Sequence, residues 1–233
     1  MKVKMECPGN SISSDTVDDQ TSPTRPRKFV KLSNPESDMF QTKTSSEDTC
    51  LKVDGKCLFV SSGILSLVSP TFMRKIEEKV SCSDPLEIEL EGKKYDDVLE
   101  FLKCIHPSIM KRLSMENIPV VLPLAFEYGV KPLLSNCIAI VIEQFDKLDF
   151  DYDDDDPVHA ENICLYLAKS FEYNLPDLKE TCLQLATHNY YLMPKEKVKS
   201  LPVEAKAELK GRVIEDMTKR NEAQAKFCEL EVM

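Results

Sequence analysis

Residues 50–60 read CLKVDGKCLFV, and this stretch indicates how the first folded part of the chain begins. Two short apolar runs, at 50–53 and 56–60, flank the dipeptide Asp54-Gly55. Asp-Gly is favoured in two-residue hairpin turns, because both central residues of such a turn need a positive φ. The stretch therefore predicts a β-hairpin.

Upstream of the hairpin, residues 1–37 are rich in Ser, Thr and Pro and carry apolar side chains without a period. This composition predicts a disordered tail, because too little apolar surface is available to offset the entropy lost on ordering. The basic run RPRK at 25–28 is compatible with a nuclear address, although a solvated charge cluster is the more common explanation. Order is expected from residue 38, with a short strand over 39–43.

Two short helices are expected directly after the hairpin. Ser61 and Ser62 can cap the first of them. Ser69-Pro70 begins the second, since proline at the first helical position loses no hydrogen bond. The apolar residues of the second helix recur at helical spacing and predict one buried side; they are Phe72, Met73 and Ile76.

A strand and a third helix follow. Residues 86–90, LEIEL, alternate apolar and acidic side chains, which predicts a strand with one buried face and with its glutamates in solvent. Residues 95–105 place their apolar side chains on one side of a helix. That helix is expected to end at His106, because the residue before a proline is disfavoured in the α region.

The second half of the chain repeats itself with a shift of 45 residues. Residues 115–140 align with 160–185 without a gap and share nine identities, among them the triplets ENI and FEY. Gly129 aligns with Asn174, and these two residue types best tolerate the left-handed conformation just past a helix end. Each unit therefore predicts a helix, a left-handed stop and a second helix, and stacked units would bury their apolar faces against each other.

Inside the repeat, Cys137 aligns with Cys182, and Phe126 aligns with Phe171. We expect all four side chains to lie in the core, where a cysteine behaves as a small apolar group. Equivalent positions in two similar helix pairs should face the same way. Their recurrence is therefore interpreted as packing and not as chemistry.

Beyond the repeat, residues 195–201 are expected to form a linker, and residues 202–228 a long helix. The apolar side chains of that helix are irregularly spaced, and residues 218–226 are almost wholly polar. We expect this end of the helix to be solvated, with partner binding as the alternative.

The net charge of −10 comes mainly from one short segment. Residues 146–156 carry seven acidic side chains and one basic side chain, whereas the parts on either side are nearly balanced. Like charges at this density resist packing, so the segment predicts an extended, solvated linker. Phe150 and Tyr152 leave docking to a partner as an alternative, and the clustered aspartates leave calcium binding. The acidic balance argues against the cationic surface that nucleic-acid binding requires.

Nine cysteines and three histidines form no pattern typical of a metal site, a disulfide framework or a catalytic centre. No two cysteines are separated by two residues, and neither a secretory leader nor an apolar run of membrane-spanning length is visible. We therefore expect free thiols in a reducing compartment, cytoplasmic or nuclear, with no metal, no cofactor and no membrane partner. No nucleophile–base pair or phosphate-binding loop at motif spacing points to an enzyme.

In this order of elements, the segment 48–145 resembles a BTB/POZ domain, and the second helical unit resembles the extension that follows this domain in BTB adaptor proteins. The resemblance implies an α+β, mostly helical fold in which a small sheet is flanked by helices. The matching positions are Asp48 before the first strand, the hairpin turn 54–56, Leu65, the run 69–72 (SPTF), the strand 86–90, the helix 95–105, the run 124–130 (LAFEYGV), Leu133 and Cys137.

The chain is accordingly expected to divide into five parts. These are a disordered tail at 1–37, a BTB/POZ domain at 38–145, an acidic linker at 146–156, a helical-pair extension at 157–192, and a C-terminal linker and helix at 193–233.

BTB/POZ domains are interaction modules, often homodimers, and many are substrate adaptors of cullin-based ubiquitin ligases. The resemblance therefore implies a non-enzymatic, self-associating adaptor or scaffold that contacts a cullin and an unknown substrate protein. A BTB-type transcriptional or chromatin regulator is the alternative, and the basic run at 25–28 is its only support.

The partner-binding residues expected from this resemblance and from the helix after Ser69 are Asp48, Phe72, Ile76, Glu77, Glu78, Val80 and Tyr128. The chain departs from the family at two places. Ser61-Ser62 stands where the family often has His and a basic residue, so Asp48 lacks that basic partner. The hydrophobic-x-Glu motif of cullin binders falls on 80–82 (VSC), without the Glu, and 76–78 (IEE) has that composition four residues earlier. An apolar anchor beside a carboxylate is a common partner contact, and an exposed helix end is the alternative.

Overall fold

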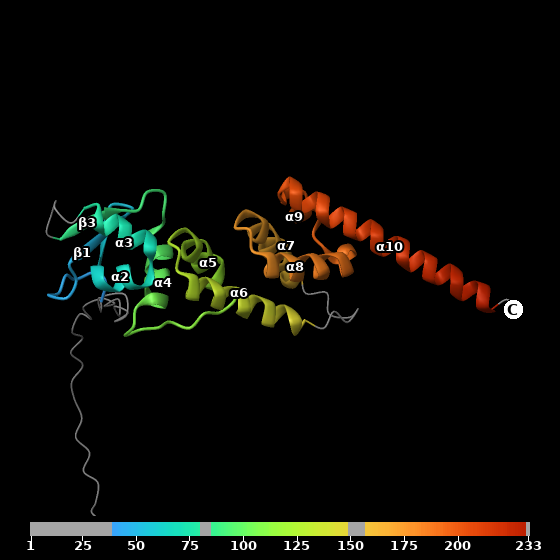
Figure 1. Ribbon diagram of the computed structural model, residues 1–233, viewed down its shortest axis with the longest axis horizontal. Helices are drawn as coiled ribbons and strands as arrows, with labels where there is room; N and C mark the ends of the chain where they lie inside the picture. Colours follow the sequence, from blue (N-terminus) through green and yellow to red (C-terminus); the bar gives the residue numbers. More distant parts are fainter. Residues whose placement is uncertain (1–38, 80–84, 149–156, 232–233) are drawn as a thin grey trace, which may run out of the picture. The chain divides into compact units, whose positions relative to one another are not determined.

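The computed structural model describes residues 39–79, 85–148 and 157–231 (Figure 1). The predicted tail at 1–37, and most of the acidic segment at 146–156, lie outside the described residues. The elements in chain order are β1 (Thr49–Val53), β2 (Lys56–Val60), α2 (Ser62–Val68), α3 (Pro70–Glu77), β3 (Leu86–Glu89), α4 (Tyr95–Ile105), α5 (Ile118–Glu127), α6 (Lys131–Asp146), α7 (Pro157–Glu172), α8 (Pro176–His188), η1 (Tyr190–Leu192), α9 (Lys195–Ser200) and α10 (Val203–Glu231).

The strands form one three-stranded sheet in the order β2-β1-β3. β1 and β2 are the predicted antiparallel hairpin, and Asp54 and Gly55 have φ values of 48° and 73°, which confirms the turn. β3 pairs with β1 in parallel, after the chain has crossed over through α2 and α3. The Asp54 carboxylate accepts a hydrogen bond from the Tyr95 backbone N–H at 3.1 Å, so the hairpin turn also caps the start of α4.

The strand expected at 39–43 is wrong, because these residues form turns and irregular backbone. The segment still contacts the hairpin through one backbone hydrogen bond, from the Phe59 N–H to the Phe40 carbonyl at 2.8 Å. The Phe40 ring is buried and meets the His106 ring edge-on, with ring centroids 5.5 Å apart. A buried aromatic ring, rather than a strand ladder, therefore holds this segment.

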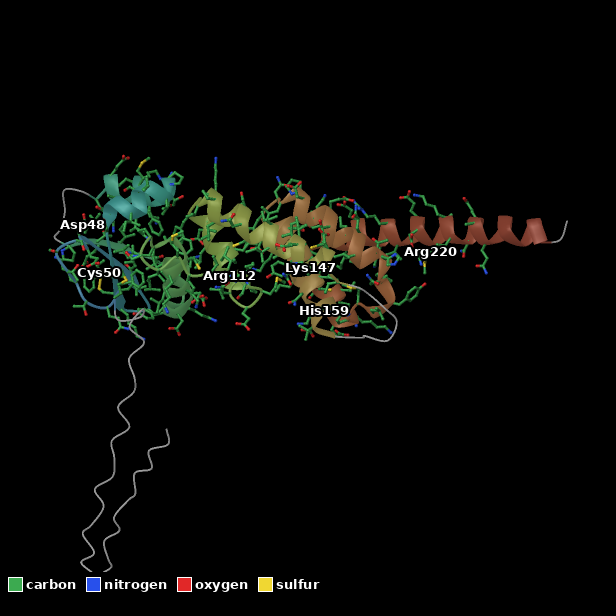
Figure 2. All side chains as sticks on the ribbon, turned by 90° about the horizontal axis from the view of Figure 1, so that it is seen from below. Asp48, Cys50, Arg112, Lys147, His159 and Arg220 are labelled. Carbon is green, nitrogen blue, oxygen red and sulfur yellow. A yellow bond between two sulfur atoms is a disulfide. The ribbon has the colours of Figure 1, made fainter. Side chains whose placement is uncertain are left out.

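The expectation of free thiols is wrong at one pair. Cys50 on β1 (Figure 2) forms a disulfide with Cys57 on β2, and their Cα atoms are 5.6 Å apart. The ladder pairs Cys57 with Lys52, so Cys57 and Cys50 are diagonal neighbours on the same face of the hairpin. Cys104, Cys137, Cys164 and Cys182 are free.

The repeated units form two helix pairs, α5–α6 and α7–α8, as predicted. Gly129 and Asn174 have φ values of 66° and 50°, so both stops are left-handed. A Cβ atom on Gly129 would lie 3.3 Å from Cγ of Pro70, at the start of α3, which is a second reason for glycine there. Cys137 and Cys182 are both fully buried, which confirms their packing role.

The same expectation is wrong for Phe126, whereas Phe171 is partly buried and packs against the core. Phe126 is 43% exposed, and its ring lies against that of Tyr173 with centroids 4.7 Å apart. Phe171 is half-buried beneath the Lys179 ammonium, which lies 4.9 Å from the ring centroid. Leu122 and Ala125 of α5 are fully buried, whereas Phe126, one turn beyond Leu122, packs against Tyr173 of the second unit.

The C-terminal part contains more helix than expected, because residues 195–200 form α9 and not a linker. α10 then contacts both α7 and α8. Its buried side chains are Ala205, Leu209 and Val213, spaced four residues apart on one face. Among the described residues, no helix is long and apolar enough to cross a membrane.

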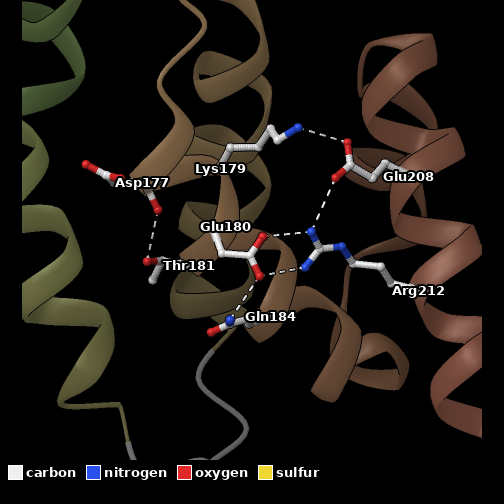
Figure 3. A network of polar contacts seen from close by, with 7 residues as sticks. All are labelled: Asp177, Lys179, Glu180, Thr181, Gln184, Glu208 and Arg212. Carbon is white, nitrogen blue, oxygen red and sulfur yellow. Dashed lines mark hydrogen bonds and ion pairs between the residues drawn. The ribbon is translucent and has the colours of Figure 1, made fainter.

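Polar contacts join α8 to α10 beside this apolar seam (Figure 3). The Arg212 guanidinium donates to both carboxylate oxygens of Glu180, at 2.8 and 2.7 Å. The Lys179 ammonium lies 3.1 Å from a carboxylate oxygen of Glu208. These contacts favour one position of α10 on the second helix pair.

Candidate partner-binding site

Helix α3 is fixed at its first residue by a buried serine. The Ser69 side chain is fully buried, and its hydroxyl accepts a hydrogen bond from the Phe72 N–H at 3.0 Å. The same hydroxyl donates to the backbone carbonyl of Tyr128, at the end of α5. The predicted cap is therefore confirmed, and it also ties α3 to the first helix pair.

Three of the residues expected to bind a partner form the inner side of α3 and its packing surface. Phe72 and Tyr128 are buried, and their rings stack with centroids 4.4 Å apart. Burial also raises the pKa of the Tyr128 hydroxyl, with a smaller contribution from Glu127. Ile76 is 7% exposed. In this structure these side chains orient α3 and offer almost no surface to a partner.

The outer side of α3 carries the two carboxylates that the sequence singled out. Glu77 and Glu78 are both exposed at the end of the helix, and Glu78 lies 3.9 Å from Arg74. Beyond them, the Lys79 ammonium donates to the Glu87 carbonyl on β3 at 2.9 Å, which fixes the helix end to the sheet. Val80, the remaining member of the expected set near this helix, lies outside the described residues.

Sequence reasoning missed two exposed apolar side chains on the same pair of helices. Leu67, near the end of α2, is 86% exposed, and Met73 on α3 is 43% exposed. Helical spacing alone assigns Met73 to the buried side, because it follows Phe72 directly. We call the exposed set Met73, Glu77 and Glu78 the α3 surface. It combines an apolar side chain with acceptors for hydrogen bonds, as partner anchors commonly do.

Asp48 lies at a different place, just before β1 and beside the start of α2 (Figure 2). Its carboxylate accepts hydrogen bonds from the Ser62 N–H at 2.6 Å and from the Ser62 hydroxyl at 2.5 Å. Partial burial alone would raise the pKa of this carboxyl, but its hydrogen bonds, those from Ser62 foremost, together outweigh burial and lower the pKa. Ser62 thus replaces the basic partner whose loss the sequence indicated.

Residues 39–79, 85–148 and 157–231 contain no group of three or more His, Cys, Asp or Glu side chains that could hold a metal. Burial raises the pKa of the Cys137 thiol to about 12 and that of Cys164 to about 11, so both remain protonated at neutral pH. The clustered aspartates considered for calcium lie mostly outside the described residues.

Comparison with known proteins gives a family match for the first folded part of the chain. The sequence model of the BTB/POZ domain family matches residues 37–145. No curated protein matches the chain. Among solved structures, the BTB domain of human gigaxonin is 24% identical; the match covers 52% of this chain and 97% of that one, with a TM-score of 0.35. The family match identifies residues 37–145 as a BTB/POZ domain.

Proposed function

We propose that this protein is a self-associating adaptor that brings a bound protein to a cullin-based ubiquitin ligase. BTB/POZ domains are non-enzymatic protein-interaction modules that commonly self-associate and bind cullin-type partners. The observation that carries the proposal is the α3 surface of such a domain. It presents Glu77 and Glu78 to solvent from a helix whose other side is locked into the core.

The physical basis is preorganisation. Ser69 and Lys79 hold the two ends of α3, and the buried Phe72 fixes its rotation. A partner that docks on this helix would therefore not have to order it, so less conformational entropy is lost on binding. An apolar contact at Met73 flanked by carboxylates would suit a partner groove with hydrogen-bond donors at its rim.

The proposal also assigns separate tasks to the parts of the chain. The BTB/POZ domain at 38–145 would bind a second copy and the cullin, and the acidic segment 146–156 would connect it to the rest. The helical pair at 157–192 and the C-terminal helix at 193–233 would bind the substrate protein. Support for this division comes from the second helix pair, which repeats the geometry of the first and carries its own seam with α10.

A pull-down with a purified cullin N-terminal domain tests the ligase half of the proposal. We expect the full chain to bind, and the double variant Glu77→Lys/Glu78→Lys to lose binding because it reverses two exposed charges on the α3 surface. The matched control is Glu89→Lys/Glu91→Lys, which makes the same charge change at two exposed positions near β3. Equal binding by both double variants, or no binding by the unmodified chain, would contradict cullin recruitment through α3.

Sedimentation of the purified chain tests self-association separately. A dimer that dissociates on dilution is the expected result, and a monomer at all concentrations would remove this half of the proposal. The alternative, a nuclear regulator, rests on the run at 25–28, which lies outside the described residues. Nuclear location of a tagged chain that binds no cullin would favour that alternative.

A further inference from the structure

A pocket of about 380 Å³ opens in the C-terminal part of the chain, among η1, α9 and the first half of α10. Its apolar lining comes from Tyr190, Tyr191, Met193 and Val198. Met193 is 5% exposed, whereas the Tyr191 side chain is 78% exposed. The pocket thus has a buried apolar wall and an aromatic side chain that solvent reaches freely.

Four lysines complete the lining, and no carboxylate takes part in it; they are Lys195, Lys199, Lys206 and Lys210. The Lys206 ammonium donates to the Lys199 carbonyl at 3.0 Å, so it is held at the end of α9. Lys199 also pairs with the exposed Glu196 at 2.7 Å. Across the described ranges, Lys195 and Lys210 form no ion pair. Two of the four cations are therefore available to a partner.

The lysines are positioned by packing elsewhere in the helix. Ala205 and Leu209 are fully buried where α10 packs on the second helix pair. Lys206 and Lys210 each follow one of these residues and are four positions apart, so they lie on one side of the same helix. The seam that fixes α10 therefore also fixes these two lysines relative to the pocket.

An apolar pocket with a cationic rim selects its ligand by both properties. The methylene chains of the lysines extend the apolar wall while their ammonium groups stay in solvent. A carboxylate-rich segment gains attraction at the rim, and one aromatic side chain fills the pocket. Nucleic acid fits less well, because it needs a continuous basic surface, and Glu204 and Glu208 lie on the same turns of α10.

We propose that this pocket binds an acidic peptide segment of a partner protein, with one aromatic side chain of that segment inserted among Tyr191, Met193 and Val198. The pocket lies outside residues 37–145, so this binding goes beyond the cullin contact and does not depend on it. An adaptor with such a site would recruit proteins through acidic, aromatic-containing stretches.

The chain contains no tryptophan, which makes a direct assay possible. The probe is a short peptide of Asp and Glu with one central Trp, whose fluorescence is followed while the full chain is added. Saturable binding that weakens in high salt is the expected result. The variant Lys195→Gln/Lys210→Gln should bind about tenfold more weakly, at about 1.4 kcal/mol per tenfold change.

The matched control is Lys94→Gln/Lys131→Gln, which removes two charges at exposed positions of the BTB/POZ domain. It should leave peptide affinity unchanged within about twofold, since those charges lie outside the pocket. Tyr191→Ala tests the aromatic contact, and because Tyr191 is 78% exposed, the fold should tolerate the change. We expect this variant to bind the peptide about tenfold more weakly as well.

Several outcomes would overturn the proposal. No binding, or equal weakening by the control variant, would show that the pocket is not the site. A peptide with Ala in place of Trp is used to displace the Trp peptide from the chain. If it displaces the Trp peptide as well as an unlabelled copy of that peptide does, charge alone drives binding. If the chain binds no peptide but binds phosphatidylserine vesicles through the same lysines, the pocket is a membrane-binding site. If it binds no peptide but forms a dimer through the same lysines, the pocket binds a second copy. Cullin binding is unaffected in each case, so failure here is distinguishable from failure of the adaptor proposal.

Discussion

The substitution Ser69→Ala tests whether one buried hydroxyl holds α3 in place. The hydroxyl accepts from the Phe72 N–H at 3.0 Å and donates to the Tyr128 carbonyl. Loss of an N-cap side chain costs about 1 kcal/mol in a typical helix. A buried carbonyl that loses its donor costs about 1–2 kcal/mol more. We therefore expect the free energy of unfolding to fall by about 2–3 kcal/mol, since both bonds are lost together.

For a chain of this length, such a loss lowers the melting temperature by roughly 4–12 °C. Far-UV circular dichroism of the full chain measures it. The matched control is Ser61→Ala, because Ser61 is the N-cap of α2 but its side chain makes no capping hydrogen bond. That control should change stability by less than about 0.5 kcal/mol.

A small effect at Ser69, no larger than that at Ser61, would refute the reasoning. It would mean that the two hydrogen bonds add no net stability and that α3 is held by apolar packing alone. The functional consequence separates the two possibilities further. If Ser69 preorganises α3, Ser69→Ala should also weaken the proposed cullin contact at a temperature where the variant is still folded, because α3 then has to be ordered on binding.

Leu209→Ala empties a fully buried position between α10 and the second helix pair, so it should lower the free energy of unfolding, measured in urea, by about 2–4 kcal/mol. Ile214→Ala, at a 65% exposed position, should change that free energy little. Arg212→Ala removes the bidentate pair with Glu180; because both side chains are partly exposed, the loss should be about 1 kcal/mol at low salt and smaller at high salt. The lowered pKa of Asp48 predicts that its contribution to stability is present above its ordinary pKa of 3.8 and is lost as pH falls through the folded value. Asp48→Asn should therefore make stability less dependent on pH below 3.8, and an unchanged acid limb in pH-dependent unfolding would contradict the role of its hydrogen bonds.

Local chemistry made much of the fold predictable. The turn at Asp54-Gly55 needs positive φ at both positions, and few other residue pairs supply it. The left-handed stops at Gly129 and Asn174 were visible because only a few residue types accept that conformation without strain. Cys137 and Cys182 recur at inward positions because the second helix of each pair needs a small apolar side chain there.

The errors share a different cause, which is that the direction of a side chain depends on distant packing. Phe126 recurs in the repeat and still faces outward, because its contact is Tyr173 of the other unit. Ile76 matches a partner motif in composition but belongs to the buried side of α3, where Phe72 also lies. Residues 195–200 form a helix despite their polarity, because Val198 packs against the core.

The net charge of −10 describes neither of the two surfaces proposed to bind partners. The α3 surface presents the carboxylates of Glu77 and Glu78, with Arg74 beside Glu78, whereas the C-terminal pocket is lined by lysines and by no carboxylate. A partner that complements one of these surfaces is repelled by the other, because like charges in a contact cost free energy. An adaptor needs this property: its two partners must not compete for one site. Opposite charge on the two surfaces would supply that selectivity independently of their shapes. Reversing the charge of one surface should therefore abolish binding of its own partner and leave binding at the other surface unchanged.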